Sequence, residues 1–124
     1  MTLNRINNRD AKIRSYDFSL EIIKLVDDLK KDTVSEVIAK QILRSATSIG
    51  ANIIEAQASP TRRDFSLFLS HSLKSANETV YWLNLLKDSK KSTNDKIEPL
   101  VFECEQLCKI LGSSILTMKT NGYK

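Results

Sequence analysis

The stretch that decides the fold runs from residue 40 to residue 86 and reads KQILRSATSIGANIIEAQASPTRRDFSLFLSHSLKSANETVYWLNLL. In its first half, apolar residues recur at alternating steps of three and four, which places them on one face of a helix. This seam consists of Ala39, Ile42, Ala46, Ile49, Ile53 and Ala56. Gly50 lies inside the same helix, where glycine costs about 1 kcal/mol relative to alanine. We therefore predict that a neighbouring helix packs closely against Gly50.

The second half of the stretch is a second helix, separated from the first by a turn. Ser59 and Pro60 mark the break, because proline suits the first turn of a helix and serine can cap it. The apolar pattern then resumes at Phe65, Phe68, Leu69, Leu73, Ala76, Val80, Leu83 and Leu86. The stretch is therefore predicted to form a helical hairpin.

Two further helices flank this hairpin. Ser15 is a candidate cap for the first, whose apolar stripe is Phe18, Ile22, Leu25 and Leu29. Thr33, followed three residues later by Glu36, matches a capping box. It places the start of the first hairpin helix near residue 34. The last helix carries a seam from Ile97 to Met118, with Pro99 near its start.

The predicted fold is an all-α, up-and-down four-helix bundle that occupies residues 15–119. Its helices are expected at about 15–31, 34–58, 60–88 and 97–118. Residues 1–14 are expected to form a polar basic arm, and residues 120–124 a short tail.

The chain has 124 residues and a net charge of +4, and the excess of positive charge is located in residues 1–14 and in the end of the chain from Lys119. A nearly neutral bundle with basic ends favours nucleic-acid binding less than a basic face would. Residues 1–14 lack the apolar region of a signal peptide, and no run of about 18 apolar residues could span a membrane. We expect a cytoplasmic protein without a membrane partner.

The sequence predicts no catalytic residue, no cofactor and no metal site. His71 is the single histidine, and no nucleophile with an orienting group accompanies it in the sequence. Cys104 and Cys108 are four residues apart, and two ligands do not make a metal site. We interpret them as small apolar residues on the core seam. The glycines are too scattered for a phosphate-binding loop.

One group of basic residues lies inside the predicted bundle and comprises Lys40, Arg44, Arg62 and Arg63. Arg62 and Arg63 fall in the first turn of a helix, where the helix dipole disfavours positive charge. An anionic partner such as nucleic acid, or an acidic neighbour such as Asp64, would explain them. The alternative is an ordinary solvated surface.

A second candidate group comprises Glu55, Glu78, Tyr81 and Trp82. These residues would form an oligomer or partner interface, because tyrosine and tryptophan are enriched among interface anchors. The alternative is local packing, with Glu78 paired to Lys74 one turn away. Four apolar residues off the seam of the last helix also favour self-association: Leu100, Leu107, Ile110 and Leu116.

Nearly the whole chain resembles the bacterial four helix bundle protein family, first described from intervening sequences of 23S rRNA genes. The resemblance is carried by QILRSATSIGANIIEAQ (41–57), RRDF (62–65), SLKSANETVYWLNLL (72–86), ECEQLCKIL (103–111) and YDFSLEIIKL (16–25). It implies an all-α bundle that assembles as a ring, commonly a homopentamer, and it does not imply an enzyme. The distantly similar accessory variability determinant of diversity-generating retroelements binds nucleic acid and a reverse transcriptase. That role is not carried over, because the present bundle has no net positive charge.

The sequence therefore predicts a non-enzymatic, homo-oligomeric interaction protein that contacts RNA, DNA or a nucleic-acid enzyme. The alternative is a structural adaptor for protein partners without affinity for nucleic acid. An enzyme is the third class considered, and the sequence offers no catalytic constellation for it.

Overall fold

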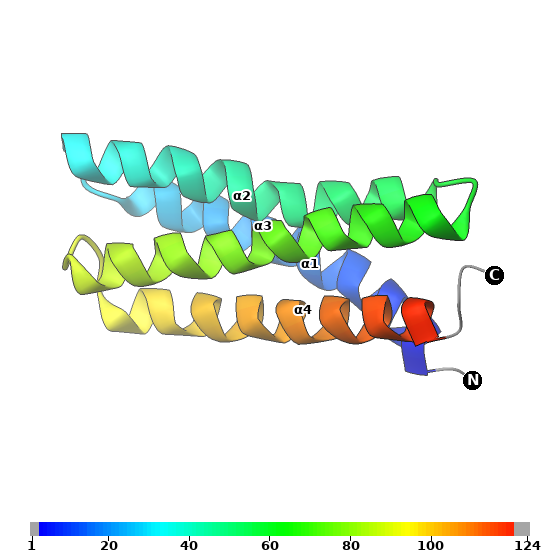
Figure 1. Cartoon of the computed structure of the whole chain (residues 1–124). Helices are drawn as coiled ribbons and strands as arrows, with labels where there is room; N and C mark the ends of the chain where they lie inside the picture. Colours follow the sequence, from blue (N-terminus) through cyan, green and yellow to red (C-terminus); the bar gives the residue numbers. More distant parts are fainter. Residues whose placement is uncertain (1–2, 121–124) are drawn as a thin grey trace.

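The structure is a computed structural model that describes the backbone of residues 3–120 and the side chains of residues 11–120. Its helices are α1 (Leu3–Asp28), α2 (Thr33–Gln57), α3 (Arg62–Asp88) and α4 (Asn94–Thr120). Each helix packs against the next along the chain, and α4 closes the circle against α1; over the described residues, no Cα atoms of diagonal helices lie within 8 Å of each other. Figure 1 shows the four helices running alternately in opposite directions. The predicted class, all-α with four helices, is confirmed.

The core follows the seam that the deciding stretch predicts. Ile42, Ala46 and Ile49 of α2 are completely buried, and Leu83 and Leu86 of α3 pack into the same cluster. Burying an aliphatic side chain of this size contributes about 1.5–3 kcal/mol before entropy is counted. Packing of these faces, more than helix propensity, therefore stabilises the bundle.

The predicted close approach at Gly50 is confirmed, and its partner is Ser15 of α1. A Cβ atom added to Gly50 would lie 3.1 Å from the Ser15 Oγ. Ser15 is fully buried inside α1, where its hydroxyl donates to the Lys12 carbonyl at 3.1 Å. The prediction that Ser15 caps the first helix is therefore wrong.

Helix α1 begins at Leu3, far ahead of the predicted start near residue 15. The helical backbone thus includes most of the segment that was expected to be an arm. Within the described side chains, contacts distant in sequence hold residues 11–14 in the bundle, since Ala11 is buried in the core and Arg14 reaches α4. The Arg14 guanidinium donates to both carboxylate oxygens of Glu103, at 2.9 and 2.7 Å.

The helix starts differ from the predicted caps by a few residues. Asp32 caps α2 by accepting from the Ser35 N–H at 2.9 Å, so the cap precedes Thr33. Thr61 caps α3 by accepting from the Asp64 N–H at 3.0 Å. Ser59, the predicted cap, instead donates its hydroxyl to a carbonyl of the preceding helix.

Helix α4 includes Pro99 and begins earlier than predicted, at Asn94. A proline lacks the N–H that would bond to the carbonyl four residues before it, here that of Asp95. Asp95 lies in the exposed first turn of α4, where water can satisfy that carbonyl. The early proline is therefore compatible with a continuous helix.

None of the helices, over the residues that the structure describes, is long and apolar enough to cross a membrane.

Candidate functional site

The four residues of the predicted basic group do not form one surface. Arg44 lies in the middle of α2 and faces α3, where it pairs with Glu78. Lys40 lines a groove beside α1. Arg62 and Arg63 lie at the start of α3, next to the end of α2. The end of α2 is roughly 20 Å from Arg44 along the axis of α2. The group therefore divides into three separate locations.

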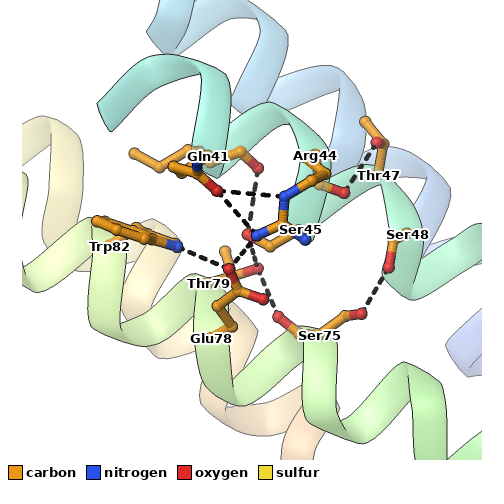
Figure 2. Close-up of polar contacts among 10 residues, drawn as sticks. Gln41, Arg44, Ser45, Thr47, Ser48, Ser75, Glu78, Thr79 and Trp82 are labelled. Carbon is orange, nitrogen blue, oxygen red and sulfur yellow. Dashed lines mark hydrogen bonds and ion pairs between the residues drawn. The ribbon is translucent and has the colours of Figure 1, made fainter. Parts of the chain in front are cut away.

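Arg44 belongs to a polar cluster between α2 and α3, shown in Figure 2. Its guanidinium donates to the Glu78 carboxylate and to the Gln41 side-chain oxygen, the latter at 3.2 and 2.9 Å. The Trp82 indole N–H donates to the same Glu78 oxygen at 2.9 Å. That indole N–H and then the Arg44 guanidinium hold the pKa of Glu78 below its ordinary value. Glu78 thus has hydrogen-bond partners on two helices, and Lys74, its predicted partner, adds a weaker electrostatic attraction.

Hydroxyl groups next to this cluster also join α2 to α3. Thr79 donates to the Ser45 hydroxyl at 2.8 Å, and the hydroxyls of Ser48 and Ser75 lie 2.5 Å apart (Figure 2). Their small side chains let the two helices approach closely. This seam is fully engaged in holding α2 against α3, so we assign it a structural role.

The predicted interface group is also divided. Glu78, Tyr81 and Trp82 lie together on α3, and the Tyr81 ring meets the Trp82 ring edge-on at 5.0 Å. Trp82 is half-buried, whereas Tyr81 is 60% exposed. Glu55 is exposed on a distant part of α2 and contacts none of them.

The remaining cations, Arg62 and Arg63, line an open groove of about 770 Å³ together with Lys119 of α4. We call this the α3–α4 groove. Thr61, Ser66 and Ser70 line it as well, and Asp64 is its single acidic residue. No ion pair between described residues involves any of the three cations.

Sequence reasoning did not include Lys119, the last residue of the predicted bundle, in the basic group. Its position was available from topology, because antiparallel neighbours place the end of α4 beside the start of α3.

Exposed apolar side chains form an outer stripe on α1, opposite its core face. The stripe comprises Ile13, Tyr16, Leu20 and Ile23, with exposures between 42 and 67%. Helix α3, diagonal to α1, exposes a second apolar set. That set is Leu67, Tyr81 and Leu85. We call these two sets the α1 face and the α3 face.

The interpretation of the surplus apolar residues on α4 is partly wrong. Leu107 is completely buried in the core, and Leu100 and Ile110 are half-buried against it. Leu116, in contrast, is 65% exposed. The bundle needs a wider apolar face on α4 than its seam suggested, because α4 packs on both α1 and α3.

The fold does not bring His71 of α3 into one cluster with the two cysteines of α4. Cys104 is buried and donates to the Ala76 carbonyl at 3.3 Å, while Cys108 is half-buried next to Asn77. The contact with Cys108 and burial raise the pKa of the Cys104 thiol. His71 is exposed and meets the Phe68 ring edge-on at 5.9 Å. Among the side chains of residues 11–120, no three metal-binding groups converge.

Comparison with known proteins agrees with this architecture. The family model described as 23S rRNA-intervening sequence protein matches residues 8–113. One similar solved structure is a protein of unknown function from the S23 ribosomal protein family of Bacteroides thetaiotaomicron VPI-5482. It is 39% identical, with a TM-score of 0.83, and the match covers 89% of this chain and 98% of that one. No curated protein matches. The chain belongs to the 23S rRNA-intervening sequence protein family.

Proposed function

We propose that this protein is a non-enzymatic, homo-oligomeric interaction protein that binds the backbone of RNA or DNA through the α3–α4 groove. The observation that carries this proposal is the convergence of Arg62, Arg63 and Lys119, from two helices, on one groove. Guanidinium groups suit phosphate because they can donate two parallel hydrogen bonds to it. The groove also opens at the N-terminus of α3, where the helix dipole favours an anion.

Phosphate contacts of this kind give affinity without base specificity. The described residues supply no comparable set of base-reading side chains in the groove. We therefore infer binding that depends on salt and varies little with sequence. A nucleic-acid enzyme would be an indirect partner, because the groove would contact the RNA or DNA strand that the enzyme has bound.

The test is fluorescence anisotropy with labelled single-stranded RNA and DNA, at salt concentrations from about 50 to 200 mM. We expect binding that weakens steeply with salt and is largely lost in Arg62→Ala/Arg63→Ala. The matched control is Lys96→Ala/Lys109→Ala, which removes the same charge from exposed positions of α4 outside the groove. Equal loss in both variants would refute a groove site and indicate only non-specific attraction.

Self-association is the second part of the proposal, and the two exposed apolar faces support it. Exposed apolar residues that neighbour one another on a helix, as Tyr16 and Leu20 do on α1 and Tyr81 and Leu85 do on α3, are typical of an interface. The α1 face and the α3 face lie on diagonal helices, so contact between them would be head-to-tail. A head-to-tail contact closes into a ring when its rotation permits. The expected assembly is a ring, with a homopentamer favoured by the family resemblance.

Light scattering checks this part directly, since five chains of 14.1 kDa would give about 70 kDa. A monomer at micromolar concentration would contradict it.

The alternative is a structural adaptor that binds protein partners and no nucleic acid. The exposed Tyr81, stacked edge-on against Trp82, favours it, because such aromatic pairs anchor protein interfaces. Absence of RNA and DNA binding at low salt, in an oligomer of the expected mass, would decide for the adaptor.

A further inference from the structure

A second groove lies at the opposite end of the bundle from the α3–α4 groove. It is formed where α1 ends and α2 begins, and its volume is about 250 Å³. We call it the α1–α2 groove. Its volume is slightly below the usual range for ligand pockets, about 300–1,000 Å³, which suits a small molecule better than a polymer.

The floor of the α1–α2 groove is apolar. Val26 and Leu29 contribute from the α1 side, and Ala39 and Leu43 contribute from α2. Val26, Leu29 and Leu43 pack against the core but remain half-exposed. A ligand with an apolar arm would cover this surface and remove it from water.

The rim of the groove is cationic. Lys30, Lys31 and Lys40 line it, with Glu36 as its one acidic lining residue. The ion pairs recorded between described residues include none of these three lysines. Their charge is therefore available to an anionic head group.

Ser35 supplies an independent indication of a ligand. This serine lines the groove and is 1% exposed, yet its hydroxyl has no hydrogen-bond partner among the described residues. The Asp32 carboxylate is close to it: the pKa of Asp32 is lowered chiefly by the hydrogen bond from the Ser35 backbone N–H, at 2.9 Å, and further by the Ser35 hydroxyl, which lies outside hydrogen-bond geometry. The other Asp32 carboxylate oxygen lies 3.6 Å from the Lys91 ammonium group.

Buried hydroxyls without a partner are rare, because leaving one unsatisfied destabilises the fold. Rotation about a single torsion angle moves a serine hydroxyl between staggered positions. A hydroxyl at the base of a cationic groove can thus turn to donate to an anion held at the rim.

We propose that the α1–α2 groove binds a small organic anion with a short apolar arm. The lysines hold the anionic head, the Ser35 hydroxyl donates to it, and the arm lies on Val26, Leu29 and Leu43. A carboxylate and a phosphate monoester share this chemistry. The site is separate from the α3–α4 groove and independent of the proposed nucleic-acid function.

The test is a titration of the full-length, ¹⁵N-labelled protein with hexanoate, followed by NMR of the backbone amides. Phenyl phosphate is titrated in parallel to distinguish the two kinds of head group. We expect saturable shifts confined to residues 26–43 with at least one of them. Hexylammonium, which carries the opposite charge, should cause none there. Saturation by hexylammonium at these residues, or no saturation by either anion, would overturn the proposal.

Two variants separate the lysine rim from general charge. Lys40→Gln should weaken binding of the anion about tenfold. Lys109→Gln, a matched change on exposed α4, should leave it unchanged. Equal weakening in both variants would contradict a defined site.

Ser35→Ala tests the hydroxyl with two readouts of opposite sign. It should weaken anion binding, and it should raise the melting temperature of the ligand-free protein, because an unsatisfied buried hydroxyl is removed. A merely structural serine would not give both effects. Unchanged binding in Ser35→Ala would remove the hydroxyl from the site.

Discussion

At the scale of single residues, Gly50 shows how a sequence signal becomes a packing constraint. A glycine inside a helix costs about 1 kcal/mol relative to alanine, yet here the missing Cβ leaves room for Ser15 of α1. An added Cβ would be 3.1 Å from the Ser15 oxygen, closer than ordinary contact. The gain in propensity and the crowding therefore oppose each other in Gly50→Ala.

We predict that Gly50→Ala is more favourable by about 0.5–1 kcal/mol when Ser15 is replaced by alanine. Removing the hydroxyl relieves the crowding, so the full helix propensity of alanine is then expressed. Urea unfolding of the wild type, both single variants and the double variant measures this coupling. Additive effects would show that Ser15 moves aside without cost.

The sequence predicted that a neighbouring helix approaches Gly50 closely, but not which residue makes the contact. A glycine on an apolar seam indicates a close neighbour, whereas the identity of that neighbour depends on the register between two helices. Ser15 was accordingly mistaken for a cap, because serine favours both caps and tight helix contacts. Ser35 was not singled out either, since an unpartnered hydroxyl can be recognised only after folding.

At the scale of elements, the cluster around Glu78 joins α2 to α3 and responds to pH. The Trp82 indole N–H and the Arg44 guanidinium both favour the carboxylate form, so the pKa of Glu78 is lower in the folded protein. The resulting stabilisation is fully present above the ordinary pKa of 4.5. It is lost as the pH falls through the lowered pKa.

We predict that Glu78→Gln destabilises the protein at pH 7 by about 0.5 kcal/mol, a small effect because the ion pair is partly exposed. The difference from wild type should shrink at pH 3, below the ordinary pKa of 4.5, because the wild-type carboxyl group takes up a proton as the pH falls towards its lowered pKa. Urea unfolding at both pH values measures it. Glu98→Gln, on an exposed carboxylate of α4, is the control, and a difference unchanged by pH would contradict the mechanism.

Sequence patterns predicted the four helices but not all their ends. The start of α1 was missed because its first residues are polar, and contacts distant in sequence, such as that of Arg14 with Glu103, could not be read from the local pattern. Tertiary contacts override weak local preferences in such segments. The caps were missed by one or two residues because equally suitable capping residues lie close by, Thr33 next to Asp32 and Ser59 two positions before Thr61.

At the scale of the whole molecule, the bundle separates surfaces that the sequence placed together. Lys40, Arg44 and Arg62 form one basic group along the chain, but the fold assigns them to a groove, an ion pair and a second groove. Lys119, distant in sequence, joins Arg62 instead. Residue types thus indicated which side chains carry charge, whereas only the arrangement of helices showed which of them act together.

The separation of the α1 face from the α3 face leads to a prediction about assembly. Tyr16→Glu/Leu20→Glu should disrupt the α1 face, and Leu67→Glu/Leu85→Glu should disrupt the α3 face, each by placing charge on exposed apolar positions. Light scattering should give a single-chain mass for either variant alone. Phe102→Glu, on an exposed α4 residue outside both faces, should keep the assembly.

Mixing the two variants distinguishes a head-to-tail contact from a symmetric one. In a head-to-tail contact, the intact α3 face of the first variant meets the intact α1 face of the second, and one sound interface forms. The mixture should then contain dimers with one chain of each kind, and these dimers should not grow further. In a symmetric contact of α1 face with α1 face, the first variant would stay monomeric in the mixture, which would exclude a ring built from these two faces.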